Sequence, residues 1–221
     1  MHITICGLAA SGKSTIARLL AIRHHLTYIS LGFIFRAVGM LALRKNLNIA
    51  TISETEMRKR VGYRWDGSQA KIAIDEADVT EVLHDSRIAE TTACMLAQSE
   101  NWGCLQRFCD SIVASYADIV CEGRNAGMEF LPHAFVKFAL VANLEVKVAR
   151  RYAEFNAKGC TFSFQEIERQ IKERDEDDMQ RSCAPFRIPC DATVIDTTHL
   201  TIEECVERMS VVIAQRKCLS V

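Results

Sequence analysis

Near its start the chain reads Gly7-Leu8-Ala9-Ala10-Ser11-Gly12-Lys13-Ser14-Thr15, which matches the phosphate-binding loop pattern of Gly, four residues, Gly-Lys, and Ser or Thr. Its glycines let the backbone turn so that successive N–H groups point at phosphate oxygens, and the helix that follows adds its positive N-terminal end. Lys13 would reach the outer phosphates of a nucleoside triphosphate, and the Ser14 hydroxyl would bind Mg2+. The motif therefore predicts a nucleotide site.

The residues on either side of this loop have the patterns that such a site requires. Residues 3–6 form a short apolar run that predicts a buried strand, and residues 13–24 carry apolar side chains at helical spacing. A strand, a loop and a helix in this order favour a phosphate-binding loop over a glycine-rich turn that only joins two elements.

The composition is that of an ordinary protein with one sizeable core. The 221 residues are 49% apolar and 25% charged, and the net charge of -1 is no electrostatic reason to expect nucleic acid or a membrane as partner. No apolar run approaches the roughly 20 residues of a membrane span, and the first strand begins so close to Met1 that we expect no targeting segment. We expect a cytoplasmic protein, and a monomer.

Ten cysteines are many for a chain of this length, but no two of them form a Cys-x-x-Cys pair. Most, such as Cys6 and Cys121 within apolar runs, are typical of small buried hydrophobic side chains in a reducing compartment. The pattern favours neither disulfides nor a zinc site.

Alternation of apolar strands and helices predicts an α/β fold. The near-continuous apolar run 134–142 is typical of a strand buried on both faces, which indicates a parallel sheet covered by helices on both sides. Residues 61–80 predict a short insertion of antiparallel β-strands. The other strands are expected at 3–6, 26–31, 118–123 and 192–196, and the helices at 13–24, 32–45, 52–60, 81–98, 102–116, 144–158, 164–181 and 202–217.

Three further stretches resemble the cytidylate kinase family, which are nucleoside monophosphate kinases of the P-loop class. They are Gly32-Phe33-Ile34-Phe35-Arg36, Glu122-Gly123-Arg124-Asn125-Ala126-Gly127, and residues 171–181 with Ala184-Pro185. Their order along the chain makes the resemblance specific, and it covers nearly the whole sequence. It implies a three-layer P-loop fold with a five-stranded parallel sheet. The core would comprise 1–34, 116–155 and 185–221, an acceptor-binding insertion 35–115, and a short helical lid 156–184.

The resemblance also implies roles for individual residues in transfer of the ATP γ-phosphate to a (d)CMP-type nucleotide. ATP would bind residues 7–15 and the basic pair Arg150 and Arg151, while Mg2+ would be held by Ser14 and, through water, by Glu122. Lys13, Arg124, Arg174 and Arg181 would be catalytic, and the acceptor would contact Arg36, Arg124, Asn125, Arg174, Asp178 and Arg181.

Physical chemistry supports these roles but leaves simpler readings open. Phosphoryl transfer needs positioning and neutralisation of charge, and the planar fork of arginine binds phosphate bidentately. Arg174, Asp178 and Arg181 share one face of a helix, where a solvated surface with i,i+4 pairs is the plain alternative. Arg124 could equally be a surface loop arginine, and Glu122 a helix-capping or loop acid.

The sequence departs from the family pattern where the acceptor base would lie. Leu31 replaces a serine, Phe35 a tyrosine, Cys94 a base-contacting serine, Gly103 a base-contacting arginine, and Asn125 the aspartate that reads the cytosine amino group. Arg107, one helical turn beyond Gly103, is a candidate substitute. An amide can donate as well as accept, so Asn125 could face a carbonyl. We hypothesise a relaxed or changed acceptor base preference, because lost hydrogen-bonding groups forfeit discrimination.

Two other functions compete with a nucleoside monophosphate kinase. One is a P-loop kinase of another small phosphorylated or hydroxylated acceptor, and the other is a nucleotide-binding relative without catalysis. The retained arginines favour a phosphorylated acceptor, and intact Lys13 and Ser14 speak against a degenerate protein. A GTPase switch is the least favoured alternative, since the chain has neither an Asn-Lys-x-Asp motif nor an Asp-x-x-Gly switch.

Overall fold

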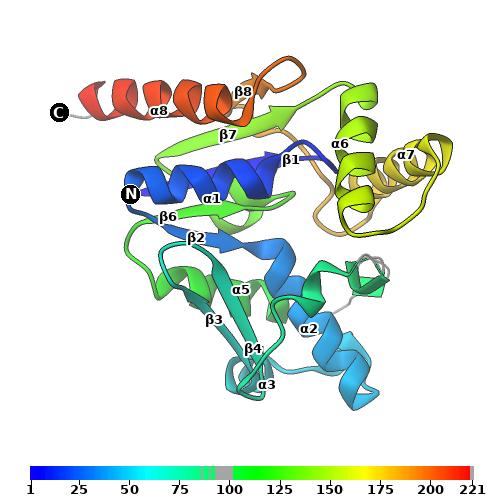
Figure 1. Cartoon of the computed structure of the whole chain (residues 1–221). Helices are drawn as coiled ribbons and strands as arrows, with labels where there is room; N and C mark the ends of the chain where they lie inside the picture. The colour runs from blue at the N-terminus through cyan, green and yellow to red at the C-terminus, as the bar shows by residue number, and fades with distance from the viewer. Residues whose placement is uncertain (86, 90, 93–101, 220–221) are drawn as a thin grey trace.

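A five-stranded parallel sheet forms the centre of the molecule, in the order β2-β6-β1-β7-β8 (Figure 1). The computed structural model describes residues 1–85, 87–89, 91–92 and 102–219. The strands are β1 (His2–Gly7), β2 (Thr27–Ser30), β6 (Ile119–Glu122), β7 (Val136–Val141) and β8 (Thr193–Asp196). All four pairings are parallel. The predicted sheet is confirmed, and the loop at 7–15 follows its central strand.

Helices cover both faces of this sheet. Ile3 and Ile5 of β1 pack with α1 (Lys13–His24) and α8 (Ile202–Leu219) in one apolar cluster. Ile29 of β2 and Cys121 of β6 belong to a second cluster with α2 (Leu31–Lys45) and α5 (Trp102–Ala114). The two clusters are the two sides of a three-layer fold, as predicted. No helix within the described ranges is long and apolar enough to span a membrane.

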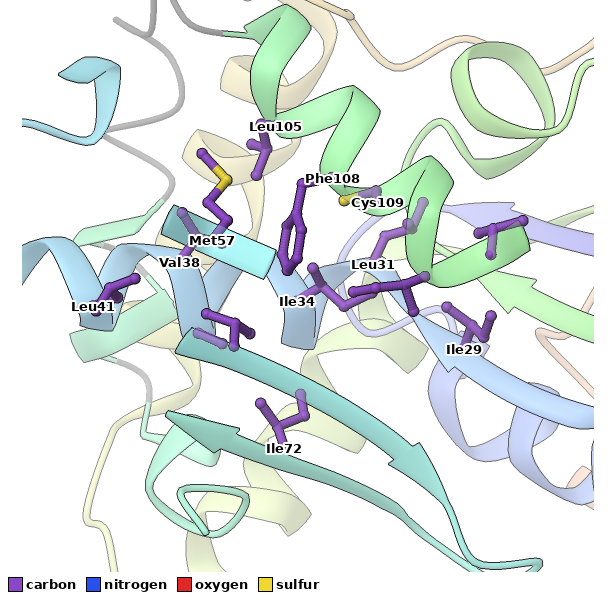
Figure 2. Packing of buried hydrophobic residues seen from close by; sticks show 14 of the residues in the cluster. Ile29, Leu31, Ile34, Val38, Leu41, Met57, Ile72, Leu105, Phe108 and Cys109 are labelled. Atoms are coloured by element: carbon purple, nitrogen blue, oxygen red, sulfur yellow. The ribbon is translucent and has the colours of Figure 1, made fainter. Parts of the chain in front are cut away.

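The segment between β2 and β6 builds a second unit beside the sheet. It contains η1 (Ile49–Thr51), α3 (Glu54–Arg60), β3 (Val61–Trp65), β4 (Ala70–Ile74), β5 (Ala77–Asp78) and η2 (Val82–His84). Strands β3, β4 and β5 form an antiparallel sheet, which confirms the predicted insertion of antiparallel strands. Figure 2 shows Ile34 and Val38 of α2 packed with Met57, Ile72 and Phe108, so this unit is continuous with the core of one sheet face.

Two element boundaries differ from the prediction for reasons of capping. Leu31 begins α2 instead of ending the strand, because the Ser30 side chain caps the helix by accepting from the Phe33 N–H. The helix predicted over 81–98 does not start at 81: residues 82–84 form a 3-10 turn, and the Asp85 carboxylate accepts from the Arg87 N–H. Residues 87–89 and 91–92 are helical, and most of the remainder lies outside the described residues.

One element was missed. Residues Ala126–Phe130 form η3, a π-helical turn directly after β6, closed by a hydrogen bond from the Leu131 N–H to the Ala126 carbonyl. Such single turns are frequent at functional sites. Sequence periodicity has no signal for it, since the turn is too short.

The cysteine prediction holds only in part. Cys6 and Cys121 are buried, and the cysteines in the described part of the chain are all free thiols. However, Cys160, Cys190 and Cys218 are exposed, because they lie in loops and at the end of α8 instead of in apolar strands.

The helix predicted for the lid, α7, contacts both the preceding helix of the predicted core, α6, and the phosphate-binding loop through one buried carboxylate. Helices α6 (Leu144–Ala157) and α7 (Phe164–Gln180) pack together, and a capping box of Ser163 and Glu166 starts α7. Lys147 of α6 pairs with Asp175 of α7, and both side chains are about nine-tenths buried. The other carboxylate oxygen of Asp175 accepts from the Ala9 N–H at 3.0 Å. Asp175 therefore joins both helices to the loop.

Removing the carboxylate charge should reveal the importance of this link. We expect Asp175→Asn to lower the free energy of unfolding by about 3–5 kcal/mol, because the Lys147 ammonium would be left buried without an anion. Urea denaturation measures the loss. The control is Glu173→Gln, which removes an exposed partner of Arg169 and should cost about 0.5 kcal/mol or less. A loss below about 1 kcal/mol for Asp175→Asn would contradict the assignment.

Candidate functional site

A cleft opens at the carboxyl ends of the central strands, where ligands bind in open α/β sheets. It is lined from the loop, from α2 and α5, from the end of β6 and from α7. The lining residues are Lys13, Ser14, Leu31, Gly32, Phe35, Arg36, Ala89, Thr92, Trp102, Glu122, Gly123, Arg124, Asn125, Phe130, Arg174, Asp178 and Arg181. The cleft thus brings together the residues that the sequence predicted for catalysis, for the acceptor and for Mg2+, whereas Lys13 and Ser14 are the loop residues that line it.

The loop at 7–15 has the backbone that its glycines allow. Gly12 caps α1 with φ +88°, in the left-handed region that favours glycine. A Cβ at Gly7 would lie 2.6 Å from the Leu140 carbonyl oxygen, so only glycine fits there. A Cβ at Gly7 would also lie 2.7 Å from the Ser11 hydroxyl and 3.4 Å from the Lys13 side chain, so the loop is compact around Lys13.

Lys13 is buried at the bottom of the cleft. Its ammonium donates to the Leu8 carbonyl at 2.7 Å and lies 3.4 Å from the Ser11 hydroxyl. Burial, together with the nearby Arg124 guanidinium, lowers the pKa of Lys13 to about 7. A phosphate would supply the negative charge that this ammonium needs in order to stay protonated.

Glu122 ends β6 inside a cage of hydroxyl groups. Its Oε1 accepts from Ser30 Oγ at 2.5 Å, from Ser14 Oγ at 3.1 Å and from the Tyr28 hydroxyl at 3.3 Å. Burial and the adjacent Glu122 charge raise the pKa of Tyr28 well above its usual value, so its hydroxyl keeps the proton that it donates. The reading of Glu122 as a loop acid is wrong, since it is a buried strand residue.

Sequence reasoning missed Tyr28 and Ser30. A signal existed: the two residues are two apart in a strand, so their side chains point to the same side of the sheet. In the register of the sheet Ser30 is also the partner of Glu122.

Arg124 and Arg181 form an ionic cluster around the buried carboxylate of Asp178. Arg124 donates to Asp178 at 2.5 Å and to the Gly7 carbonyl at 3.1 Å, and Arg181 lies 3.8 Å from Asp178. Burial alone would raise the pKa of Asp178, but Arg124, Arg174 and Arg181 hold it below its usual value. The solvated-face reading of 174–181 is therefore wrong for Asp178, which is buried and lines the cleft with Arg174.

Arg36 lies on the α2 side of the same cleft. It donates to the Leu83 carbonyl at 2.7 Å, and its guanidinium lies 5.1 Å from the centre of the Phe33 ring. Burial lowers the pKa of Arg36 to about 10, which leaves it charged at neutral pH.

The predicted basic pair does not line the cleft. Arg150 donates to the Thr197 hydroxyl at 3.0 Å and to the Thr197 carbonyl at 2.7 Å. Arg151 pairs with Glu154 at 2.9 Å and lies over the Phe155 ring. Their contact with ATP stays a prediction.

The residues that depart from the family pattern have different places. Leu31 is buried and occupies the space where a side chain at Gly123 would point, with a contact of 2.9 Å. Arg107 does not replace the lost arginine: it pairs with Glu54 at 2.9 Å, outside the cleft lining. Cys94 lies outside the described residues.

Asn125 is buried, and its orientation is set by a backbone carbonyl. The side-chain N–H group donates to the Ala184 carbonyl, while Oδ1 has no hydrogen-bond partner within the described residues. Turning the amide over would bring two oxygens together, so Oδ1 is the amide atom that is left without a partner. A buried acceptor without a partner is costly unless a ligand supplies a donor.

The Lys13 pKa leads to a prediction about protons. At pH 8 the unliganded ammonium is mostly deprotonated, and a bound triphosphate restores its charge, so ATP binding should take up about one proton. Affinity should consequently fall as the pH rises above 7. Calorimetry in buffers of different ionisation enthalpy measures the uptake. At pH 6, where Lys13 is already charged, uptake should be close to zero; equal uptake at both values would contradict the prediction.

Comparison with known proteins agrees with the geometry. The sequence model described as cytidylate kinase matches residues 3–215. A cytidylate kinase of Carboxydothermus hydrogenoformans is 35% identical, with 98% of each chain covered, and one of Thermotoga maritima is 33% identical, with 97% of each covered. The crystal structure of TT1252 from Thermus thermophilus is similar in fold, with a TM-score of 0.50, 17% identity and 97% of each chain covered. The chain belongs to the cytidylate kinase family.

Proposed function

We propose that this protein transfers the γ-phosphoryl group of ATP to a cytidine-type nucleoside monophosphate. The observation that carries the proposal is the presence of two phosphate-binding groups in one cleft. Lys13 and the loop suit a triphosphate, and Arg36 with Arg124 suits a second phosphate. Relatives named cytidylate kinase support this pairing of substrates.

The reaction needs no side-chain base, because an ionised acceptor phosphate is already a nucleophile. An oxygen of the acceptor phosphate attacks the γ-phosphorus of ATP in line, the bond to the β,γ-bridging oxygen breaks, and ADP leaves with those electrons. Lys13, Arg124, Arg174 and Arg181 stabilise the charge that spreads over the transferred group. Helix α7, which carries Arg174 and is followed by its C-cap residue Arg181, excludes water when the lid closes.

The donor set beside the loop fits Mg2+. Ser14 Oγ and the Glu122 carboxylate are 3.1 Å apart at the cleft wall and supply the hard oxygen ligands that this ion prefers. No group of three or more acidic, His or Cys side chains lies together in the part of the chain described, so most ligands would be waters and phosphates, as is usual for Mg2+ in kinases. When bound, the ion would neutralise charge on the phosphates.

Asn125 supports cytosine as the acceptor base. One of its two amide N–H groups donates to Ala184 and Oδ1 has no partner among the described residues, so Oδ1 is an acceptor that suits the amino group of cytosine. This orientation argues against a changed preference. It leaves the hypothesis of a relaxed preference in place, because Leu31 is apolar and Arg107 is engaged elsewhere. The domain limits, the monomeric state and the cytoplasmic location remain predictions.

An acceptor panel tests the substrate. We expect kcat/KM for CMP and dCMP to exceed that for UMP and dUMP by about 10- to 100-fold, the worth of about one buried hydrogen bond, with AMP and GMP poorer still. Steady-state kinetics with saturating ATP measures these ratios. A kcat/KM for CMP that exceeds those for all other acceptors by about 10,000-fold or more would contradict a relaxed base preference. A higher kcat/KM for UMP than for CMP would contradict the role of Asn125.

A single substitution tests the acceptor-phosphate site. We expect Arg124→Met to raise the KM for CMP by about 10- to 100-fold and to lower kcat, because one charge-assisted contact is lost in the ground and transition states. The KM for ATP should change far less. Arg64→Met, on the exposed side of β3, is the control and should leave all constants unchanged. Unchanged acceptor kinetics for Arg124→Met would remove this residue from the site.

A further inference from the structure

We propose that three aromatic rings, those of Phe35, Trp102 and Phe130, hold the base of the acceptor nucleotide by stacking and edge contact. We call these three residues the aromatic wall. The inference rests on the proposed function, since it assumes that the acceptor phosphate binds the arginines of the same cleft.

The aromatic wall is built from three separate elements. Phe35 lies on α2, Trp102 begins α5, and Phe130 ends the π-helical turn η3. The ring centres of Phe35 and Trp102 are 5.8 Å apart, those of Phe35 and Phe130 6.0 Å, and those of Trp102 and Phe130 6.1 Å. Each ring therefore contacts both others, and all three line the cleft.

The π-helical turn connects the wall to the rest of the site. It begins directly after Asn125, whose carbonyl accepts from two N–H groups of the turn, and it ends at Phe130. Gln106 of α5 donates to the Glu129 carbonyl at 2.8 Å, which ties the turn to the helix that carries Trp102. Asn125 and the wall are thus positioned by one rigid assembly.

The neighbouring charges define what the wall can hold. The rings line the same cleft as Arg36 and Arg124, the two arginines of the acceptor-phosphate site. Apolar rings cannot replace the hydration of a phosphate, whereas every nucleobase has a flat face that stacks on them. The occupant of the wall is therefore the base of the nucleotide whose phosphate binds the arginines.

Stacking on the aromatic wall would bind the acceptor base at positions where the side chains offer it no hydrogen bond. Leu31 is apolar, and Gly103 has no side chain. Base–aromatic stacking strengthens binding without reading the base, because it acts on any flat ring. Affinity would come from the aromatic wall and selectivity from Asn125 Oδ1.

Fluorescence can test the wall without disturbing it. The chain has two tryptophans, and Trp65 packs edge-on against Tyr28 outside the cleft lining. In the variant Trp65→Phe, Trp102 is the remaining indole. We expect CMP, without ATP, to change its emission saturably, and ribose 5-phosphate, which lacks a base, to leave it unchanged. An emission change of equal size with ribose 5-phosphate, or none with CMP at concentrations above its KM, would overturn the proposal.

Substitution of the indole adds a kinetic test. We expect Trp102→Leu to raise the KM for CMP about 5- to 100-fold, Trp102→Phe to recover most of the loss, and neither to change the KM for ATP. Inhibition by ribose 5-phosphate should be unaffected. A CMP KM within twofold of the parent, or an equal loss of ribose 5-phosphate inhibition, would overturn the wall. Failure of the proposed function gives a different result. In that case the parent protein would phosphorylate no nucleoside monophosphate, regardless of whether CMP changes the emission of Trp102.

Discussion

Repulsion among the cations that line the cleft is the constraint on which the arrangement of this site depends. Lys13, Arg36, Arg124, Arg174 and Arg181 share one cleft, and without phosphates their charges would oppose folding. Acids on the sheet and on α7 compensate them. Asp178 holds Arg124 and Arg181, Glu122 lies beside the loop, and Asp175 takes up the charge of Lys147 at the cleft edge. The acids thus maintain, in the unliganded protein, the positive charge that two nucleotides require.

The same acids couple parts of the chain that are far apart in sequence. Asp175 and Asp178 lie on α7, yet their partners are the Ala9 N–H of the loop and Arg124 after β6. A ligand phosphate competes with these carboxylates for the same donors and cations. We therefore expect nucleotide binding to act directly on the position of α7, because its carboxylates link the helix to the loop and to Arg124.

Much of the fold could be predicted from local sequence patterns. The strand before Gly7 and the helix after Gly12 follow from apolar spacing, and the parallel sheet follows from the continuous apolar run that became β7. The side chains that surround Glu122 could not be predicted with equal ease, because Tyr28 and Ser30 reach it across neighbouring strands. The π-helical turn and the aromatic wall were missed for a related reason, since the three rings come from α2, α5 and η3.

The order of motifs along the chain is enough to determine a phosphate-binding loop, a parallel α/β core and a set of arginines suited to a second phosphate. These depend on residue type and spacing, which are local. The orientation of the Asn125 amide and the engagement of Arg107 by Glu54 were decided by contacts with residues distant in sequence. A one-dimensional pattern can show that an amide both donates and accepts. Only the folded chain, by placing the Ala184 carbonyl beside one of its N–H groups, shows that the oxygen is the atom left without a partner.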